Sequence, residues 1–162
     1  MNLRIPKLKT YHIILLSISV LLIIACLIAT VICYPSLPDR IPMHFAADGS
    51  VDQYGGKGSA FLIPIISLVI FAILVFMLFV PRVLENPNTL RPLDVRFRPQ
   101  VVQLSTRLMV EVAFLCVAFM TYIQTFTLIQ KPLNPVGAWM IAAALVIDSL
   151  IHTIKLSTFT VK

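Results

Sequence analysis

Four long apolar stretches constrain this chain more than any other feature. They span residues 13–33, 60–80, 108–129 and 136–156, and each exceeds the roughly 18 residues that a helix needs to cross about 30 Å of hydrocarbon. Hydrophobic residues make up 59% of the sequence and charged residues only 12%, whereas about a quarter of a soluble domain is charged. The sequence therefore predicts one all-α integral membrane domain over residues 1–162, with four transmembrane helices.

The basic residues predict how these helices are oriented. Cytoplasmic loops of membrane proteins carry an excess of Lys and Arg. With the N-terminus inside, ten of the 13 basic residues fall in cytoplasmic segments and three, Arg40, Lys57 and Lys131, fall outside. We therefore expect both ends to be cytoplasmic, with a basic inner loop at 81–105. The net charge of +6 is spread between apolar runs, which indicates a lipid surface as the partner and not nucleic acid.

The first apolar stretch could instead be a signal peptide. Arg4, Lys7 and Lys9 precede it, and Ile23-Ile24-Ala25-Cys26 loosely resembles a lipoprotein processing site. However, the apolar run continues well past Cys26, and a signal-peptide core is usually only about 7–15 residues long. An uncleaved first helix is the preferred prediction.

The loop between the first two stretches, residues 34–59, holds the densest polar chemistry. Its prolines fix φ and its glycines allow tight turns, so we expect an ordered outer loop. His44, Asp48 and Asp52 recur every four residues, and one imidazole with two carboxylates is a plausible set of ligands for a divalent cation. Because Asp beside Gly more often bonds its own backbone, a turn at Asp48-Gly49 is favoured over a metal site.

This loop resembles a bacterial family of membrane domains of unknown function. The family pattern runs approximately Leu-Pro-x-x-Ile-Pro-x-His-Phe-x-x-x-Gly-x-x-Asp-x-x-Gly-x-Lys, and the chain matches it from Leu37 to Lys57 within a similarity over roughly residues 12–80. The family includes the N-terminal part of SdpI-like proteins, which give immunity to a secreted toxin and take part in its signalling. The positions carried over from this motif are Pro38, Pro42, His44, Phe45, Gly49, Asp52 and Lys57.

Two departures limit what the resemblance implies. Ala46 stands where the family often has Asn, which removes one polar contact. The second membrane domain of SdpI-like immunity proteins has no counterpart in this chain. The resemblance thus implies a membrane protein of that family, in the bacterial plasma membrane, more than it implies immunity itself.

The last two apolar stretches contain ionisable residues. The short turn at 131–135 makes the two helices neighbours, so one cluster can form from Arg107, Glu111, Asp148, His152 and Lys155. A charged side chain facing lipid costs at least about 2.5 kcal/mol, so these groups should face protein and pair. Two interpretations stay open. The cluster is either a structural set of pairs, Glu111 with Arg107 and Asp148 with His152, or a proton- or ion-responsive site.

No catalytic triad, zinc-protease helix or nucleotide-binding fingerprint occurs in the sequence, so we expect no enzyme and no cofactor. The leading prediction is a ligand-binding, sensing or toxin-immunity protein that meets an extracellular or lipid-soluble ligand through the outer loop. The alternative is a small transporter, or a subunit of one, with Glu111, Asp148 and His152 as a polar relay. Four helices are few for a transport path, so a homo-oligomer or a partner membrane protein would be needed. An accessory subunit recruited through the basic inner loop is the third prediction.

Overall fold

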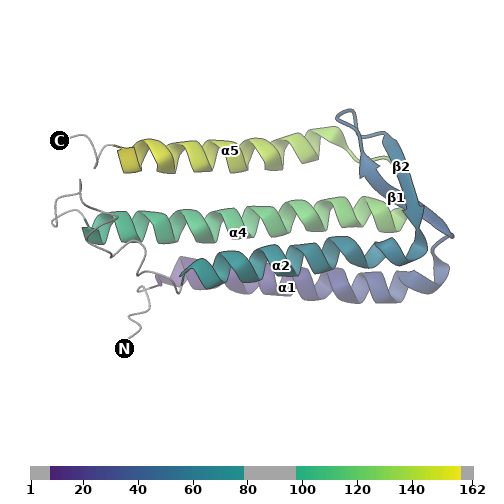
Figure 1. Cartoon of the computed structure of the whole chain (residues 1–162), viewed down its shortest axis with the longest axis horizontal. Helices are drawn as coiled ribbons and strands as arrows, with labels where there is room; N and C mark the ends of the chain where they lie inside the picture. The colour runs from purple at the N-terminus through teal and green to yellow at the C-terminus, as the bar shows by residue number, and fades with distance from the viewer. Residues whose placement is uncertain (1–7, 79–97, 158–162) are drawn as a thin grey trace.

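The computed structural model describes residues 8–78 and 98–157. In these two segments the chain forms four long helices, α1 (Thr10–Cys33), α2 (Leu62–Leu78), α4 (Arg98–Ile129) and α5 (Pro135–Ser157) (Figure 1). Each lies in a segment long and apolar enough to cross a membrane. The prediction of four spans is therefore confirmed by length and composition.

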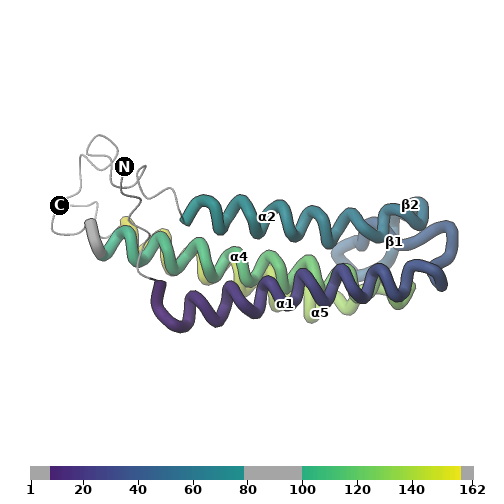
Figure 2. The backbone as a smooth tube through the Cα atoms, turned by 90° about the horizontal axis from the view of Figure 1, so that it is seen from below, coloured from purple at the N-terminus to yellow at the C-terminus, as the bar shows by residue number. Residues whose placement is uncertain are grey.

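The helices run side by side along the long axis of the molecule (Figures 1 and 2). A β-hairpin closes one end, which we call the hairpin end. α1 begins and α5 ends at the other end, which we call the terminal end. The start of α1 and the end of α5 lie together because the number of spans is even and each helix reverses the direction of the one before it.

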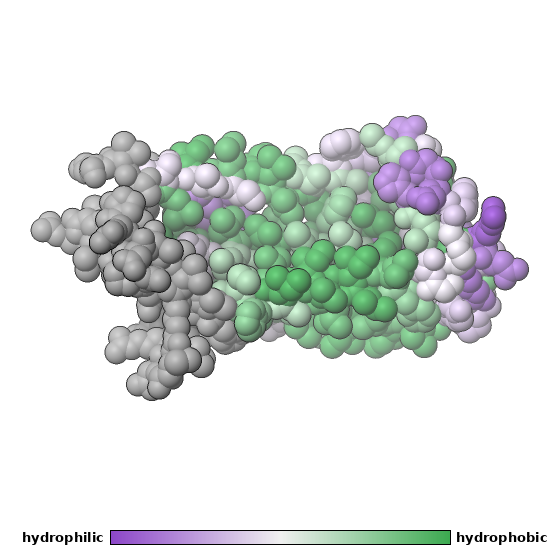
Figure 3. Space-filling view, in the orientation of Figure 1, coloured by the Kyte–Doolittle hydropathy of each residue, from purple (hydrophilic) through white to green (hydrophobic). Residues whose placement is uncertain are grey.

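α4 occupies the centre of the bundle. It packs against α1, α2 and α5, whereas α1 and α2 meet over only a few residues. Large apolar side chains on the outer surfaces are exposed, such as Ile32 at 70% and Met140 at 68%, and they form a broad apolar belt between the two ends (Figure 3). Such a belt is too apolar for a water-facing surface and fits a surrounding lipid bilayer.

α4 is longer than the sequence predicts. It begins at Arg98 instead of residue 108, so residues 98–105 of the predicted inner loop are helical, and residues 81–97 lie outside the described segments. Pro99 stands in the first turn, where a proline sacrifices no helical hydrogen bond. Val101, Ser105 and Thr106 are buried, so packing within the bundle extends the helix beyond its apolar part.

The predicted ordered loop is a two-stranded antiparallel hairpin. Strand β1 (Arg40–Phe45) pairs with β2 (Val51–Gly56), and the register shifts on either side of His44. Short 3-10 helices, Tyr34–Ser36 and Lys57–Phe61, join the hairpin to α1 and α2. A small apolar core of Leu37, Ile41 and Ala60 anchors the base of the hairpin on the bundle.

The predicted tight turn between the last two helices is also present. α4 ends at Ile129, followed by Gln130 with a positive φ of 56°. The side chain of Asn134 accepts a hydrogen bond from the backbone N–H of Val136 at 3.0 Å, and Pro135 follows as the first residue of α5. Asn then Pro is a favourable way to start a helix.

Candidate functional site

An open, mainly apolar pocket lies at the hairpin end, between β1, the hairpin turn, α4 and α5. Its volume is about 310 Å³. The hairpin contributes residues 43–47 and α4 contributes Phe119 and Ile123, while Leu133 and one face of α5 complete the wall. An apolar lining with a few polar groups is typical of sites for small molecules.

Trp139 connects α5 to the hairpin turn at one edge of this pocket. Its indole Nε1 donates a hydrogen bond to the backbone oxygen of Ala47 at 3.1 Å, although the side chain remains 60% exposed. The backbone N–H of Leu133 donates to the oxygen of Gly49 at 2.9 Å. These two bonds connect the hairpin turn to the start of α5 and to the α4–α5 turn.

His44 supplies the ionisable group of the pocket. Its Nδ1 lies 2.7 Å from Oδ1 of Asp52, across the two strands. The two side chains are 65% and 46% exposed. An exposed pair of this kind contributes only about 0–1 kcal/mol to stability, so its conformation can respond to a ligand at small energetic cost.

The third residue of the predicted cation set, Asp48, does not join this pair. Its Oδ1 accepts hydrogen bonds from the backbone N–H and the hydroxyl of Ser50, at 2.9 and 2.6 Å. The two bonds hold the pKa of Asp48 below its ordinary value, because they favour the ionised carboxylate. The favoured turn is therefore confirmed, and the three side chains of the His44, Asp48 and Asp52 hypothesis do not converge.

The other motif residues build the hairpin. Pro42 and Gly49 are buried, Phe45 is half-buried and lines the pocket, and Pro38 is exposed in the entry to β1. The ammonium of Lys57 donates to the backbone oxygen of Pro35 at 3.2 Å and lies 5.0 Å from the centre of the Tyr34 ring. Lys57 therefore links the exit of the hairpin to the 3-10 helix that follows α1.

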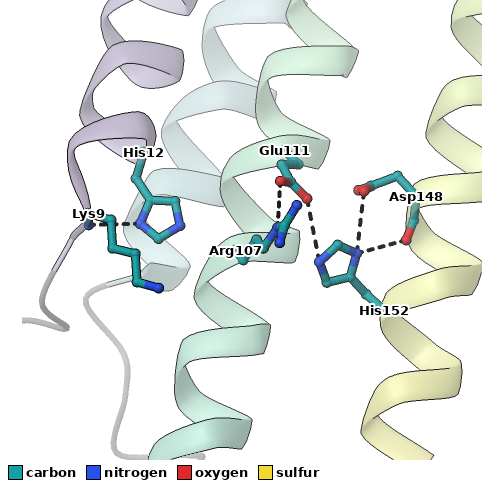
Figure 4. Close-up of polar contacts among 6 residues, drawn as sticks. All are labelled: Lys9, His12, Arg107, Glu111, Asp148 and His152. Atoms are coloured by element: carbon teal, nitrogen blue, oxygen red, sulfur yellow. Dashed lines mark hydrogen bonds and ion pairs between the residues drawn. The ribbon is translucent and has the colours of Figure 1, made fainter.

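The predicted polar cluster forms between α4 and α5 in the terminal half (Figure 4). The guanidinium Nε of Arg107 donates to Oε1 of Glu111 at 2.8 Å. His152, only 2% exposed, has Nε2 3.5 Å from Oε2 of Glu111 and Nδ1 3.4 Å from Oδ1 of Asp148. Both predicted pairs thus occur, and His152 joins them into one cluster.

The cluster is incompletely hydrogen-bonded. Glu111 Oε2, Asp148 Oδ2 and His152 Nε2 are buried and make no hydrogen bond in the described structure. One ligand atom from each residue lies within 4.8 Å of the others, which is close enough for a metal ion to contact all three. Within the described segments this is the only such group of His, Cys, Asp and Glu side chains. Lys155, the fifth predicted member, lies in the last turn of α5.

The sequence analysis did not single out several buried polar residues, among them His12 and Gln124. His12 is 3% exposed in the first turn of α1, and its Nδ1 accepts the backbone N–H of Lys9 at 3.1 Å. Gln124 is 1% exposed on α4, and its amide donates to the hydroxyl of Thr30 and the backbone oxygen of Ala60, both at 2.9 Å. An amide inside an apolar run is itself a signal, since a polar group at membrane depth needs a partner.

The pocket and the polar cluster are separate sites. Phe119 of the pocket and Glu111 of the cluster lie eight residues apart on α4, or about 12 Å along the helix axis. The geometry therefore offers one open apolar site and one buried ionisable site, with no direct contact between their ionisable groups.

One comparison with known proteins finds a match, and the matched residues include the hairpin. A family model described as "Domain of unknown function (DUF1648)" matches residues 21–68, which include the greater part of α1, the whole hairpin and the start of α2. No curated protein and no solved structure matches the chain. The match agrees with the resemblance to a membrane domain of unknown function, and it brings no activity with it.

Proposed function

We propose that this chain is a ligand-binding or sensing protein of the bacterial plasma membrane, with the hairpin on the outer face and both termini in the cytoplasm. The observation that carries the proposal is the pocket of about 310 Å³ between the hairpin, α4 and α5. It is open at the end of an apolar bundle, where a molecule dissolved in the outer leaflet can enter it. No enzymatic step is proposed.

The lining of the pocket supports one class of ligand. Phe45, Phe119 and Trp139 supply apolar surface, and His44 supplies one ionisable group whose partner, Asp52, is exposed. We infer a lipid-soluble ligand with an apolar body and one polar group that contacts His44. A secreted toxin or signal is the narrower form of this proposal, and it rests on the resemblance to SdpI-like proteins.

The only tryptophan of the chain, Trp139, provides the assay. A short bromoalkanoate combines an apolar body with one carboxylate, and its bromine quenches indole fluorescence on contact. With the protein in nanodiscs, we expect saturable quenching of Trp139 on top of the linear quenching that partition into lipid produces.

Two alanines of α5 give matched variants. Ala142 lines the pocket, whereas Ala144 is exposed outside it. Ala142→Phe should fill the pocket and abolish the saturable component, and Ala144→Phe should retain it. Purely linear quenching of the wild type would contradict a binding pocket.

The narrower proposal of toxin immunity has its own test. Deleting the gene should sensitise the source bacterium to its own spent culture medium, and unchanged growth would exclude that role.

A small transporter or transporter subunit is the second candidate. Its support is the contact of Glu111, Asp148 and His152 inside the bundle, because ionisable side chains within a membrane are the usual parts of proton and ion pathways. Proton flux into proteoliposomes that falls on Asp148→Asn would favour this function. No flux above that of empty liposomes would remove it.

A further inference from the structure

One ring nitrogen of His152 faces a carboxylate oxygen, and neither atom makes a hydrogen bond in the described structure. His152 Nδ1 lies 2.9 Å from the backbone oxygen of Asp148. A carbonyl oxygen only accepts, so Nδ1 carries the proton, and in the neutral ring Nε2 presents a lone pair. That nitrogen lies 3.5 Å from Oε2 of Glu111, as Figure 4 shows. Two electron-rich atoms that face each other in a buried site repel unless a proton or a metal ion lies between them.

The neighbouring groups do not provide that charge at these atoms. Arg107 donates its Nε to the other oxygen of Glu111, Oε1, at 2.8 Å. Asp148 brings a second carboxylate, whose Oδ2 is also buried without a hydrogen bond. With neutral His152, the two carboxylates of Glu111 and Asp148 and the guanidinium of Arg107 together carry one net negative charge. A cation bound among the three unsatisfied atoms would satisfy all of them at once.

We propose that Glu111, Asp148 and His152 bind one divalent metal ion of the zinc class. Imidazole nitrogen with carboxylate oxygen suits zinc and similar first-row ions. A histidine that binds metal through one nitrogen usually donates its other N–H to a carbonyl or carboxylate, as His152 does toward Asp148. Three protein ligands leave a fourth position for water or an anion.

The distances agree with coordination better than with a direct bond. A hydrogen bond between nitrogen and oxygen spans about 2.7–3.2 Å, shorter than the 3.5 Å between His152 and Glu111. Ligand atoms that bind zinc at about 2.0–2.2 Å in a tetrahedron lie about 3.3–3.6 Å apart. The carboxylate of Asp148 is within the 4.8 Å envelope of the group and completes the site with a small side-chain rotation.

The site would add a link between α5 and the rest of the bundle. α5 packs mainly against α4, and at the hairpin end the bonds of Leu133 and Trp139 to the hairpin turn hold it in place. Glu111 lies on α4, and Asp148 and His152 lie on α5, so an ion among them would link the two helices in the terminal half. The expected consequence of binding is a more stable α4–α5 pair.

Cobalt absorption tests the proposal directly. The full chain in detergent, washed with chelator, is titrated with Co²⁺, whose visible absorption is strong when tetrahedral and disappears when Zn²⁺ displaces it. We expect one equivalent bound by wild type, at least 10-fold weaker binding in Glu111→Gln and Asp148→Asn, and none in His152→Ala. The control is His44→Ala with Asp52→Asn, which removes the other histidine–carboxylate pair and should not change binding.

Three outcomes would overturn the metal site. These are no cobalt spectrum in the wild type, equal affinity in wild type and all cluster variants (an adventitious ion only), or no rise in wild-type melting temperature with Zn²⁺. If His152→Ala does not fold, the near-isosteric Glu111→Gln decides. A proton on His152 Nε2 or on Glu111 Oε2 would also remove the repulsion, and it predicts the first outcome. Ala142→Phe should bind cobalt normally, so failure here leaves the pocket proposal intact.

Discussion

At the scale of single residues, Gly49 shows how the hairpin motif and the last two helices depend on each other. Its φ is +85°, in the region where residues with a Cβ are strained. A Cβ at this position would also overlap with the backbone oxygen of Leu133. The close approach lets the N–H of Leu133 reach the oxygen of Gly49, so the glycine is needed for both its conformation and its contact.

Gly49→Ala should therefore lower the free energy of unfolding by about 1–3 kcal/mol, through backbone strain and the displaced Leu133 contact. Gly56→Ala is the matched control, because Gly56 has an ordinary φ of −70° and open space around it. The measurement is unfolding in mixed micelles with increasing SDS, followed by Trp139 fluorescence. Equal midpoints for the two variants would show that the turn does not constrain the fold.

The turn at Asp48 predicts a pH dependence. The pKa of Asp48 is lowered by the hydrogen bonds from Ser50, so the ionised form is favoured in the folded state. Its contribution to stability is fully present above the ordinary pKa of 3.8 and is lost as the pH falls through the lower folded pKa. Carboxyl NMR should show Asp48 titrating below 3.8, and Ser50→Ala should move that titration upward. An unchanged midpoint in Ser50→Ala would contradict this cause.

The turn itself was predictable because its chemistry is local. Asp48 and Gly49 are neighbours, and an Asp that bonds the backbone two residues later is a short-range pattern. Leu133 is 84 residues from Gly49, and no local signal connects them. The same holds for the pocket, whose walls come from three separate parts of the chain, so the sequence could indicate the loop but not its cavity.

At the scale of elements, the hydrogen bonds of Gln124 link three segments in the hairpin half of the bundle. Its amide on α4 bonds Thr30 of α1 and the backbone oxygen of Ala60 in the 3-10 helix before α2. The Thr30 hydroxyl in turn donates to the oxygen of Cys26 at 2.8 Å. Since α1 and α2 meet over few residues, this network is a main polar link between them.

Gln124→Leu should destabilise the bundle by about 0.5–2 kcal/mol, the usual range for interhelical hydrogen bonds in membranes. The control is Thr125→Val, because the exposed Thr125 hydroxyl bonds only the oxygen of Thr121 in its own helix. SDS unfolding of the two variants gives the comparison. A Gln124→Leu midpoint equal to that of Thr125→Val would mean that shape alone holds α1, α2 and α4 together.

Helix boundaries were predicted less well than the helices. The apolar pattern identified all four spans because hydrocarbon thickness sets their length. The start of α4 was placed ten residues too late, because Gln100, Gln103 and Arg107 resemble a polar loop. Arg107 is tolerated within the helix because it pairs with Glu111 and lies 5.8 Å from the centre of the Tyr11 ring. These contacts depend on packing, which hydropathy does not record.

At the scale of the whole molecule, the polar cluster could be predicted from the sequence, whereas its detailed geometry could not. The short turn at 131–135 was sufficient to predict that the ionisable residues of the two neighbouring helices can form one cluster. The tautomer of His152 and the unpaired atom that faces it could not be predicted, because they follow from the Asp148 carbonyl and from side-chain rotamers. The proposed metal site is therefore an inference from three-dimensional geometry, while the polar cluster was an inference from sequence.

The placement of both sites in the cell depends on orientation, which the distribution of basic residues predicts and thiol labelling can test. In a variant with Cys26, Cys33 and Cys116 replaced by alanine, a single cysteine is introduced at Ser50 or Gln100. Both residues are exposed, and they lie at the hairpin end and near the start of α4. The 30-residue α4 span starting at Gln100 is about 45 Å long, longer than the hydrocarbon core, so Gln100 should reach the polar region.

A membrane-impermeant maleimide should label Ser50→Cys in intact cells and Gln100→Cys only after permeabilisation. This result places the pocket where an extracellular or outer-leaflet ligand can enter, and the polar cluster in the cytoplasmic half. The reverse pattern would put the hairpin in the cytoplasm and contradict an outer-face receptor. It would leave the proposed metal site unaffected, because coordination by Glu111, Asp148 and His152 does not depend on which side of the membrane the terminal end faces.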